Sequence, residues 1–352
     1  MLDFSLMVDF AKLPLPIIQA PMAGGINTPE LAAAVANNGG VGSFGFAYSK
    51  PDQIAADLSA TRRLTQGPIN ANFFVFSPAA MPSETEAQDA LNALRSLAIQ
   101  CDVELALPQL PYYPDLLTQL EPIWAARPAM LTFHFGLPPE GVIKQAHALG
   151  ICVGMTATNG AEAEAIERAG ADFIVAQGIE AGGHRGCFHQ DQEDDQLSAL
   201  ELTKVLASRC RIPIVTAGAI MTGADIRAAL HHGASAAQLG TAFLCCDEAG
   251  TPPSYRNFLL RHPERGAALT RVFSGRSARG VQNAFMLEMG GKTVLPFPIQ
   301  NTLTAPLRQW AVKNHNGEYQ SLWAGSAYSK IRPMPAANLM RRLRAEWMAE
   351  ER

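Results

Sequence analysis

Eight short apolar runs, each followed by a polar or amphipathic stretch, constrain the fold of this 352-residue chain more than any other feature of its sequence. Alternation of this kind is typical of βα units around a parallel sheet, and eight such units predict a closed (β/α)8 barrel, or TIM barrel. With 48% hydrophobic residues the chain can also bury a core of that size. The expected strands are Ile17–Gln19, Gly40–Phe44, Ile69–Phe74, Ala129–Phe135, Ile151–Thr156, Asp172–Gln177, Ile214–Ala217 and Ala237–Leu239.

Helix signals separate most of these runs. Thr28, Asn159 and Thr222 each stand where an N-capping side chain is expected, and glycine ends each of the helical stretches that follow. Two segments depart from this rhythm. Residues 77–128 are rich in proline and predict an irregular crossover, and the polar, acidic residues 187–197 predict an exposed loop.

The βα rhythm stops after Leu244, which predicts a second domain. Residues 246–299 combine helical fragments with glycine-rich breaks such as SGRSARG and EMGGK, and we expect an added helical lid domain that contacts substrate. The barrel would comprise residues 1–245 and, as a C-terminal return, residues 300–352. Alternating Arg and Glu over Ala336–Glu350 predict a last, partly solvated helix.

Composition excludes several classes of function. The net charge of −4 and the lack of a basic run leave no electrostatic footprint for nucleic acid or an anionic membrane surface. The N-terminus lacks the basic region of a signal peptide, and no apolar run reaches the length needed to cross a bilayer. None of the six cysteines forms a CxxC pair or a spaced metal set, so we expect reduced thiols, no metal and a cytoplasmic location.

Several expected strands end in residues suited to a ligand. The first ends in QAPMAGG (19–25), where small residues let a flat ring approach the backbone, although a tight turn would use the same residues. The third ends near Asn72, whose amide offers a donor and an acceptor to a heteroaromatic edge, and Asn70 competes for this role. The fourth places His134 between two phenylalanines, where a core histidine is the commoner arrangement.

The sixth strand ends in the most informative segment, VAQGIEAGGHRG (175–186). Gln177 stands at the strand end, and Gly182 and Gly183 can offer bare backbone N–H groups to a phosphate. His184 follows them and can hold or release a proton near neutral pH, while Arg185 carries a permanent positive charge. A flexible polar loop explains these residues less well, because glycines, a histidine and a strand end coincide.

Glycine-bearing turns also follow the last two strands, at Gly218 in TAGAI and at Gly240–Thr241 in QLGTAF. The loops after strands seven and eight are the usual phosphate site of this fold, so two consecutive turns of this type predict a phosphate-bearing ligand. The chain has neither GxGxxG nor GxxxxGK(S/T) in a strand-to-helix setting, which argues against Rossmann and Walker-type sites.

In this order, QAPMAGG, ANFF, FHFG, QGIEAGGHRG, TAGAI and QLGTAF resemble the nitronate monooxygenases of class I type, formerly called 2-nitropropane dioxygenases. The resemblance covers residues 14–245 and resumes in PFPIQNTLT (296–304) and LWAG (322–325), and AGGHRG is its most specific part. It implies a non-covalent FMN with its phosphate at strands seven and eight. It further implies His184 as the active-site base and His134 in the substrate pocket. The residues it assigns to the cofactor are Pro21, Met22, Ala23, Asn72, Gln177, Gly182, Gly183, Gly218, Ala219, Gln238, Leu239, Gly240 and Thr241.

The activity implied by this resemblance is oxidation of alkyl nitronates, such as propionate 3-nitronate, to carbonyl compounds and nitrite. An electron would pass from the nitronate to FMN and on to dioxygen, so the implied partners are a nitronate or nitroalkane and dioxygen. His184 would deprotonate a neutral nitroalkane or, as imidazolium, hold the nitronate anion. The oligomeric state stays open.

Four other functions compete with this one. An NAD(P)H-dependent quinone or enoyl-thioester reductase on the same barrel would share most of the glycine turns. A dehydrogenase of the inosine monophosphate type would need a nucleophilic cysteine on a mobile loop, for which Cys187 is the candidate. A non-redox aldolase or isomerase would need a lysine or carboxylate at a strand end, where Glu180 is a weak candidate. A binding protein without catalysis would carry no flavin.

Overall fold

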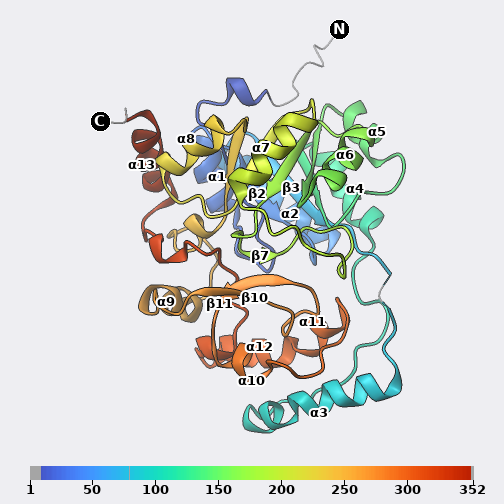
Figure 1. Cartoon of the computed structure of the whole chain (residues 1–352). Helices are drawn as coiled ribbons and strands as arrows, with labels where there is room; N and C mark the ends of the chain where they lie inside the picture. The colour runs from blue at the N-terminus through green and yellow to red at the C-terminus, as the bar shows by residue number, and fades with distance from the viewer. Residues whose placement is uncertain (1–8, 79, 350–352) are drawn as a thin grey trace.

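The computed structural model describes residues 9–78 and 80–349, and eight parallel strands form a barrel in the larger of its two layers (Figure 1). All eight expected strands are present, and their ends differ from the expected ones by at most one or two residues. The fold-class prediction of a (β/α)8 barrel is therefore confirmed. The barrel strands are β1 (Ile17–Gln19), β2 (Gly42–Gly45), β3 (Ile69–Phe74), β4 (Met130–His134), β5 (Cys152–Ala157), β6 (Phe173–Gln177), β8 (Ile214–Ala217) and β9 (Ala236–Leu239).

The strands follow one another around the barrel in the order β1-β9-β8-β6-β5-β4-β3-β2. Two backbone hydrogen bonds of 2.9 Å close the circle, from Gln19 N to Val41 O and from Val41 N to Ile17 O. Because all strands run parallel, their carboxyl ends meet on one face of the barrel. Any site assembled from strand ends must therefore lie on that face.

The helices around the barrel begin where the sequence predicts. Thr28, Asn159 and Thr222 each accept a hydrogen bond from a backbone N–H of the first helical turn, which satisfies a donor that the helix itself leaves free. The flanking helices are α1 (Pro29–Asn37), α2 (Pro51–Leu64), α4 (Leu116–Ala126), α5 (Val142–Ala148), α6 (Gly160–Arg168), α7 (Ala199–Arg209), α8 (Gly223–His231) and α13 (Ala336–Met348). Single 3-10 turns occur at Phe10–Lys12, Thr241–Phe243, Gly317–Tyr319 and Tyr328–Lys330. Among the described residues, no helix has the length and apolar character to cross a membrane.

The crossover at residues 77–128 is more regular than expected. It contains α3 (Glu84–Gln100) as well as α4, and the described residues before α3 and between the two helices have no regular secondary structure. Ser83 and Glu86 form a reciprocal capping box at the start of α3, which fixes a helix that proline content alone does not indicate. Leu94 and Leu97 of α3 pack into the second layer, so the crossover reaches beyond the barrel (Figure 1).

The second layer contains a small sheet in addition to helices, so the expectation of a purely helical lid is corrected. An antiparallel sheet in the order β10-β11-β7 joins it to the barrel, because β7 (Gly183–His184) belongs to the segment that follows β6. Its other elements are α9 (Pro253–Arg261), β10 (Ala267–Thr270), β11 (Ala278–Val281), α10 (Ala284–Glu288), α11 (Ile299–Leu303) and α12 (Ala305–Lys313). The expected boundary at residue 299 stays a prediction. Here α12 lies in this layer and α13 returns to pack on α8 and α1.

Candidate active site

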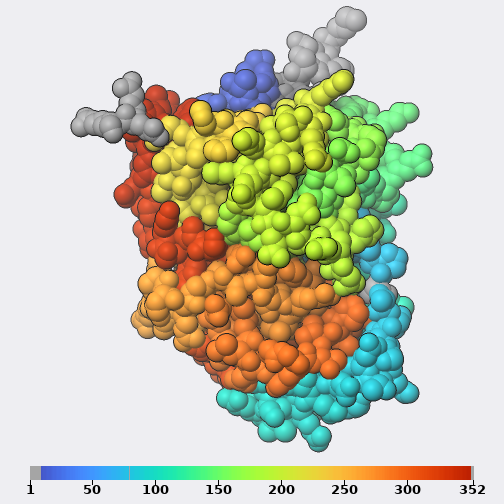
Figure 2. Space-filling model, in the orientation of Figure 1, coloured from blue at the N-terminus to red at the C-terminus, as the bar shows by residue number. Residues whose placement is uncertain are grey.

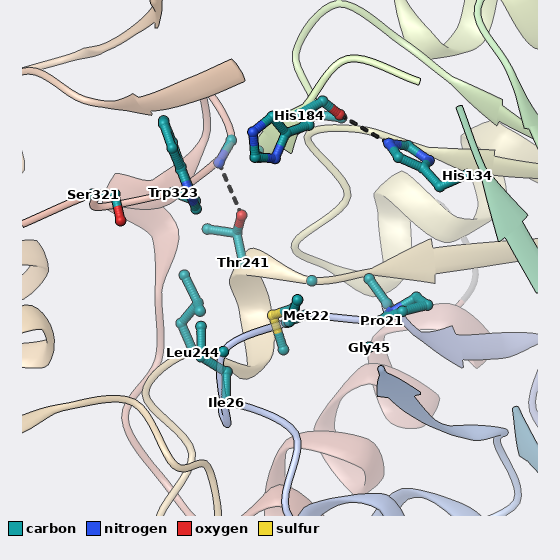
Figure 3. A pocket seen from close by; sticks show the side chains of 18 of the residues that line it. Pro21, Met22, Ile26, Gly45, His134, His184, Thr241, Leu244, Ser321 and Trp323 are labelled. Atoms are coloured by element: carbon teal, nitrogen blue, oxygen red, sulfur yellow. Dashed lines mark hydrogen bonds between the residues drawn. The ribbon is translucent and has the colours of Figure 1, made fainter. Parts of the chain in front are cut away.

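A cavity of about 850 Å³ lies between the carboxyl ends of the barrel strands and the second layer. On the outside, the two layers lie directly against one another (Figure 2). Inside, His184 and Trp323 stand on one side, and Met22, Ile26 and Leu244 on the other (Figure 3). All but one of the residues predicted for cofactor or substrate line this cavity; they are Pro21, Met22, Ala23, Asn72, His134, Gln177, Gly182, Gly183, His184, Gly218, Ala219, Gln238, Gly240 and Thr241.

Leu239 is the exception, and strand geometry explains it. Successive side chains of a strand point to opposite faces, so Gln238 lines the cavity while Leu239 points to the helices. Leu239 is 1% exposed and packs in the apolar layer that also contains Leu339 and Leu343 of α13. Its side chain is therefore directed away from any ligand in the cavity.

The ends of β8 and β9 present a group of backbone N–H donors to the cavity. Within the described part of the chain, the N–H groups of Gly218, Ala219, Gly240 and Thr241 have no hydrogen-bond acceptor. Gly218 and Ala219 adopt φ values of +135° and +53°, which turns the chain so that successive donors lie close together. Such an arrangement is suited to the oxygens of a phosphate.

Close backbone contacts explain the glycines at two other positions around the cavity. A Cβ added at Gly182 would lie 2.5 Å from the backbone nitrogen of Gly325, and one added at Gly45 would lie 2.6 Å from that of Ala23. Both distances are too short for any side chain, so these glycines let separate loops meet at the cavity wall.

His134 lines the cavity, but both of its ring nitrogens are already bonded. Nδ1 is 3.0 Å from the hydroxyl of Thr156, and Nε2 is 3.2 Å from the backbone oxygen of His184. The carbonyl can only accept, so Nε2 carries the proton and Nδ1 accepts from Thr156. Burial and the nearby Arg276 lower the pKa of His134 to about 3. His134 thus holds the His184 backbone in place as a neutral ring.

Gln177 and Arg185 fix the segment after β6 that carries His184. The Gln177 amide donates to the backbone oxygen of His184 at 2.9 Å and accepts from Gly186 N at 2.7 Å. Arg185 is 2% exposed and forms a two-pronged ion pair with Asp194, at 2.7 and 3.0 Å. The positive charge of Arg185 is therefore neutralised by Asp194, and its side chain supports the loop without lining the cavity.

His184 is the one histidine of the cavity with an unused ring nitrogen. Nε2 lies 2.9 Å from the hydroxyl of Ser274, whereas Nδ1 has no partner among the described residues. Phe135, Phe297 and Trp323 surround the ring at centroid distances of 5.5 to 5.9 Å. Burial and the charge of Arg276 lower the pKa of His184 to about 3, so the ring is neutral at pH 7 and has a lone pair to offer.

Asn72 provides a polar group on the barrel side. Its amide nitrogen donates to Thr132 at 3.0 Å, and Thr132 in turn donates to Asn70 at 3.0 Å. Asn70 is 1% exposed and lies deeper in the barrel, so Asn72 is the one of the two that reaches the cavity. Its carbonyl oxygen has no partner among the described residues and can accept from a ligand.

Sequence reasoning missed the cavity residues that come from the second layer. Arg308 on α12 lines the cavity, donates to Thr304 at 3.2 Å and to the Asn301 side chain at 3.1 Å, and has no carboxylate partner among the described residues. Burial lowers the pKa of its guanidinium. Tyr48, which follows β2, lines the same cavity. The PFPIQNTLT segment (296–304), where the family resemblance resumes just before Arg308, was the sequence feature that could have pointed to this part of the chain.

Cys187 is not an activated nucleophile. The thiol is buried, and burial raises its pKa, although Thr158 lies within 3.3 Å and partly offsets this effect. The thiolate is the reactive form of cysteine, so this environment argues against a dehydrogenase that attacks through Cys187.

Comparisons with known proteins agree with this geometry. The family model for nitronate monooxygenase matches residues 5–346. The chain is 41% identical to a nitronate monooxygenase of Pseudomonas aeruginosa over 93% of this chain and 95% of that protein. A nitroalkane oxidase structure from Streptomyces ansochromogenes superposes with a TM-score of 0.91 at 37% identity and covers 96% of this chain and 97% of its own. FabK from Thermotoga maritima, at 24% identity and a TM-score of 0.72 over 96% of this chain and 94% of its own, shares the fold.

Proposed function

The chain belongs to the nitronate monooxygenase family, and from this membership we propose that it oxidises alkyl nitronates with FMN and dioxygen to carbonyl compounds and nitrite. The observation that carries the proposal is the meeting of two features in one cavity. A neutral histidine with an unused nitrogen, His184, faces the same space as the backbone donors at the ends of β8 and β9.

The residues at the strand ends fit FMN. The free N–H groups of Gly218, Ala219, Gly240 and Thr241 would hold its phosphate. Met22 and Ala23 would border its ring system, and the carbonyl oxygen of Asn72 would accept from the polar edge. When bound, FMN supplies the electron-transfer chemistry, and the protein supplies binding and orientation.

His184 handles the proton. With a neutral nitroalkane, Nδ1 accepts the proton of the carbon next to the nitro group, and the C–H electron pair becomes the C=N bond of the nitronate. The anion formed beside the ring favours the imidazolium and raises the pKa of His184 while it is present. A nitronate that arrives already ionised needs no base, so His184 then only helps to orient the anion.

The position of Arg308 favours a substrate that carries a second negative charge, such as propionate 3-nitronate. Its guanidinium is partly buried in the cavity wall, and Nη1 has no partner among the described residues. A cation that is partly removed from water and has no anion beside it is costly, and a substrate carboxylate would supply the missing charge. The cavity of about 850 Å³ has room for such a substrate beside the cofactor.

The proposal is tested by absorbance spectra of the purified protein under anaerobic conditions. We expect the two visible bands of oxidised flavin, bleaching after addition of propionate 3-nitronate, and little change after NADH. Mass spectrometry of the released chromophore should identify FMN. A colourless protein contradicts the cofactor, and rapid bleaching by NADH alone with none by the nitronate favours the NAD(P)H-dependent reductase.

A further inference from the structure

The turn that joins β10 to β11 brings a serine against His184, and an arginine against the neighbouring Phe135 ring. Ser274, Gly275 and Arg276 form this segment, which we name the 274–276 turn. Gly275 adopts a φ of +88°, and a Cβ there would lie 2.3 Å from the backbone oxygen of Leu295. Only glycine fits such a position, so the turn is packed tightly against the backbone of residues 295–297.

Ser274 can be assigned a direction for each of its hydrogen bonds. Its hydroxyl is 1% exposed and lies 3.1 Å from the backbone oxygen of Arg276, which can only accept. The hydroxyl proton is therefore directed to that carbonyl, and Oγ remains an acceptor for Nε2–H of His184 at 2.9 Å. This places the imidazole proton on Nε2 and leaves the lone pair on Nδ1.

Arg276 is a buried cation without a counter-ion. It is 6% exposed, its Nε has no hydrogen-bond partner, and no carboxylate of the described residues pairs with it. Its guanidinium lies 3.7 Å over the ring of Phe135 and donates to the backbone oxygen of Cys187. The centroid of the Phe135 ring lies 4.5 Å from that of His134 and 5.9 Å from that of His184, so one aromatic ring separates the cation from both histidines.

We propose that the 274–276 turn positions His184 for proton abstraction: Ser274 keeps the imidazole proton on Nε2, and Arg276 keeps the ring uncharged, so that Nδ1 is the atom that takes the substrate proton. Ser274 and Arg276 act through His184 and are positioning residues. This inference rests on the proposed function, because it assigns a base to that reaction. The proton taken by Nδ1 gives an imidazolium with protons on both nitrogens, which returns one to solvent after the nitronate has formed.

The charges around His184 all act in the same direction. Arg276, His134 and Arg308 are the charged or titratable groups that act on its ring, and each disfavours the imidazolium. Arg185 acts on His134 in the same sense. The remaining neighbours, Phe74, Phe135, Phe297 and Trp323, are aromatic. We therefore expect the pKa of His184 to rise when Arg276 is replaced by an uncharged residue, because one of the positive charges that disfavour the imidazolium is then gone.

The test is nitrogen NMR of ¹⁵N-histidine-labelled protein, as purified with its cofactor, over a range of pH. The His184 signals are identified by their loss in His184→Asn. We expect the Nε2–H form in the native protein, a mixture of both tautomers in Ser274→Ala, and a rise of about one pH unit or more in the His184 midpoint in Arg276→Gln. Arg276→Lys keeps the charge and should stay close to the native midpoint.

Two matched variants serve as controls. Ser277→Ala removes a hydroxyl that has no hydrogen bond among the described residues, and Arg265→Gln removes a cation that pairs with Glu318 away from the cavity. Both should leave tautomer and midpoint unchanged. The inference is overturned if the native ring carries its proton on Nδ1, or if Ser274→Ala and Arg276→Gln match the controls. Because NMR needs no turnover, a protein that oxidises no nitronate but shows these shifts would refute the proposed function alone.

Discussion

Replacement of Arg308 by methionine tests whether the cavity selects an anionic substrate. Methionine keeps an apolar stem of similar shape and removes the guanidinium, whose Nη1 has no protein partner among the described residues. A hydrogen bond to a charged group contributes about 1.5–3 kcal/mol, which corresponds to a loss of about ten- to a hundredfold in kcat/KM. Because the contact is made at the end of the substrate remote from the reacting carbon, most of this loss should come from a higher KM.

The assay compares two nitronates of equal chain length by oxygen consumption: propionate 3-nitronate, and propyl 1-nitronate, which lacks the carboxylate. Arg308→Met should impair only the first. Lys313→Met is the matched control, since this lysine also lines the cavity but is exposed, and an exposed charge is worth about 1 kcal/mol or less. Equal losses on both substrates, or no loss on either, would refute the assignment of Arg308 to a substrate carboxylate.

Three further predictions follow from the same contacts. His184→Asn should lower kcat/KM for a neutral nitroalkane by about 10²–10⁴ and affect a preformed nitronate far less, because only the first needs a base; equal losses would exclude that role. Asp194→Asn should lower the free energy of unfolding by about 3–5 kcal/mol in urea titrations, because it leaves the buried Arg185 charge unpaired; a change below about 1 kcal/mol would contradict this. His134 has a pKa of about 3 in the folded protein and near 6.5 unfolded, so the unfolded chain binds the extra proton and stability falls as pH drops below 6.5. His134→Asn should flatten that fall by up to about 1.4 kcal/mol per pH unit, and an unchanged slope in urea titrations at several pH values would count against a neutral His134.

The barrel could be predicted from the sequence because its signals are local. Each buried strand is a short apolar run, and each capping residue lies within a few positions of the donor it satisfies. Residues 77–128 show where this fails. Their prolines predicted an irregular chain, although Ser83 and Glu86 already had the spacing of a capping box.

The barrel half of the cavity could also be predicted, since parallel strands bring their carboxyl ends to one face. The side chain of Leu239 does not line it, because Leu239 follows Gln238 and alternation turns it outward, so its assignment to the cofactor stays a prediction. The other half could not be predicted. It depends on how the second layer packs on the barrel, which brings Ser274, Arg276 and Arg308 to the cavity and the two histidines around it. The residue pattern of their own segments does not indicate this packing.

Oxygen consumption and nitrite release during turnover of propionate 3-nitronate without any NADH test the central claim most directly. The account predicts that dioxygen is consumed and nitrite appears in step with loss of the nitronate, and that NADH adds nothing to the rate. A protein that consumes no dioxygen with the nitronate, but oxidises NADH in the presence of a quinone or an enoyl thioester, would contradict it.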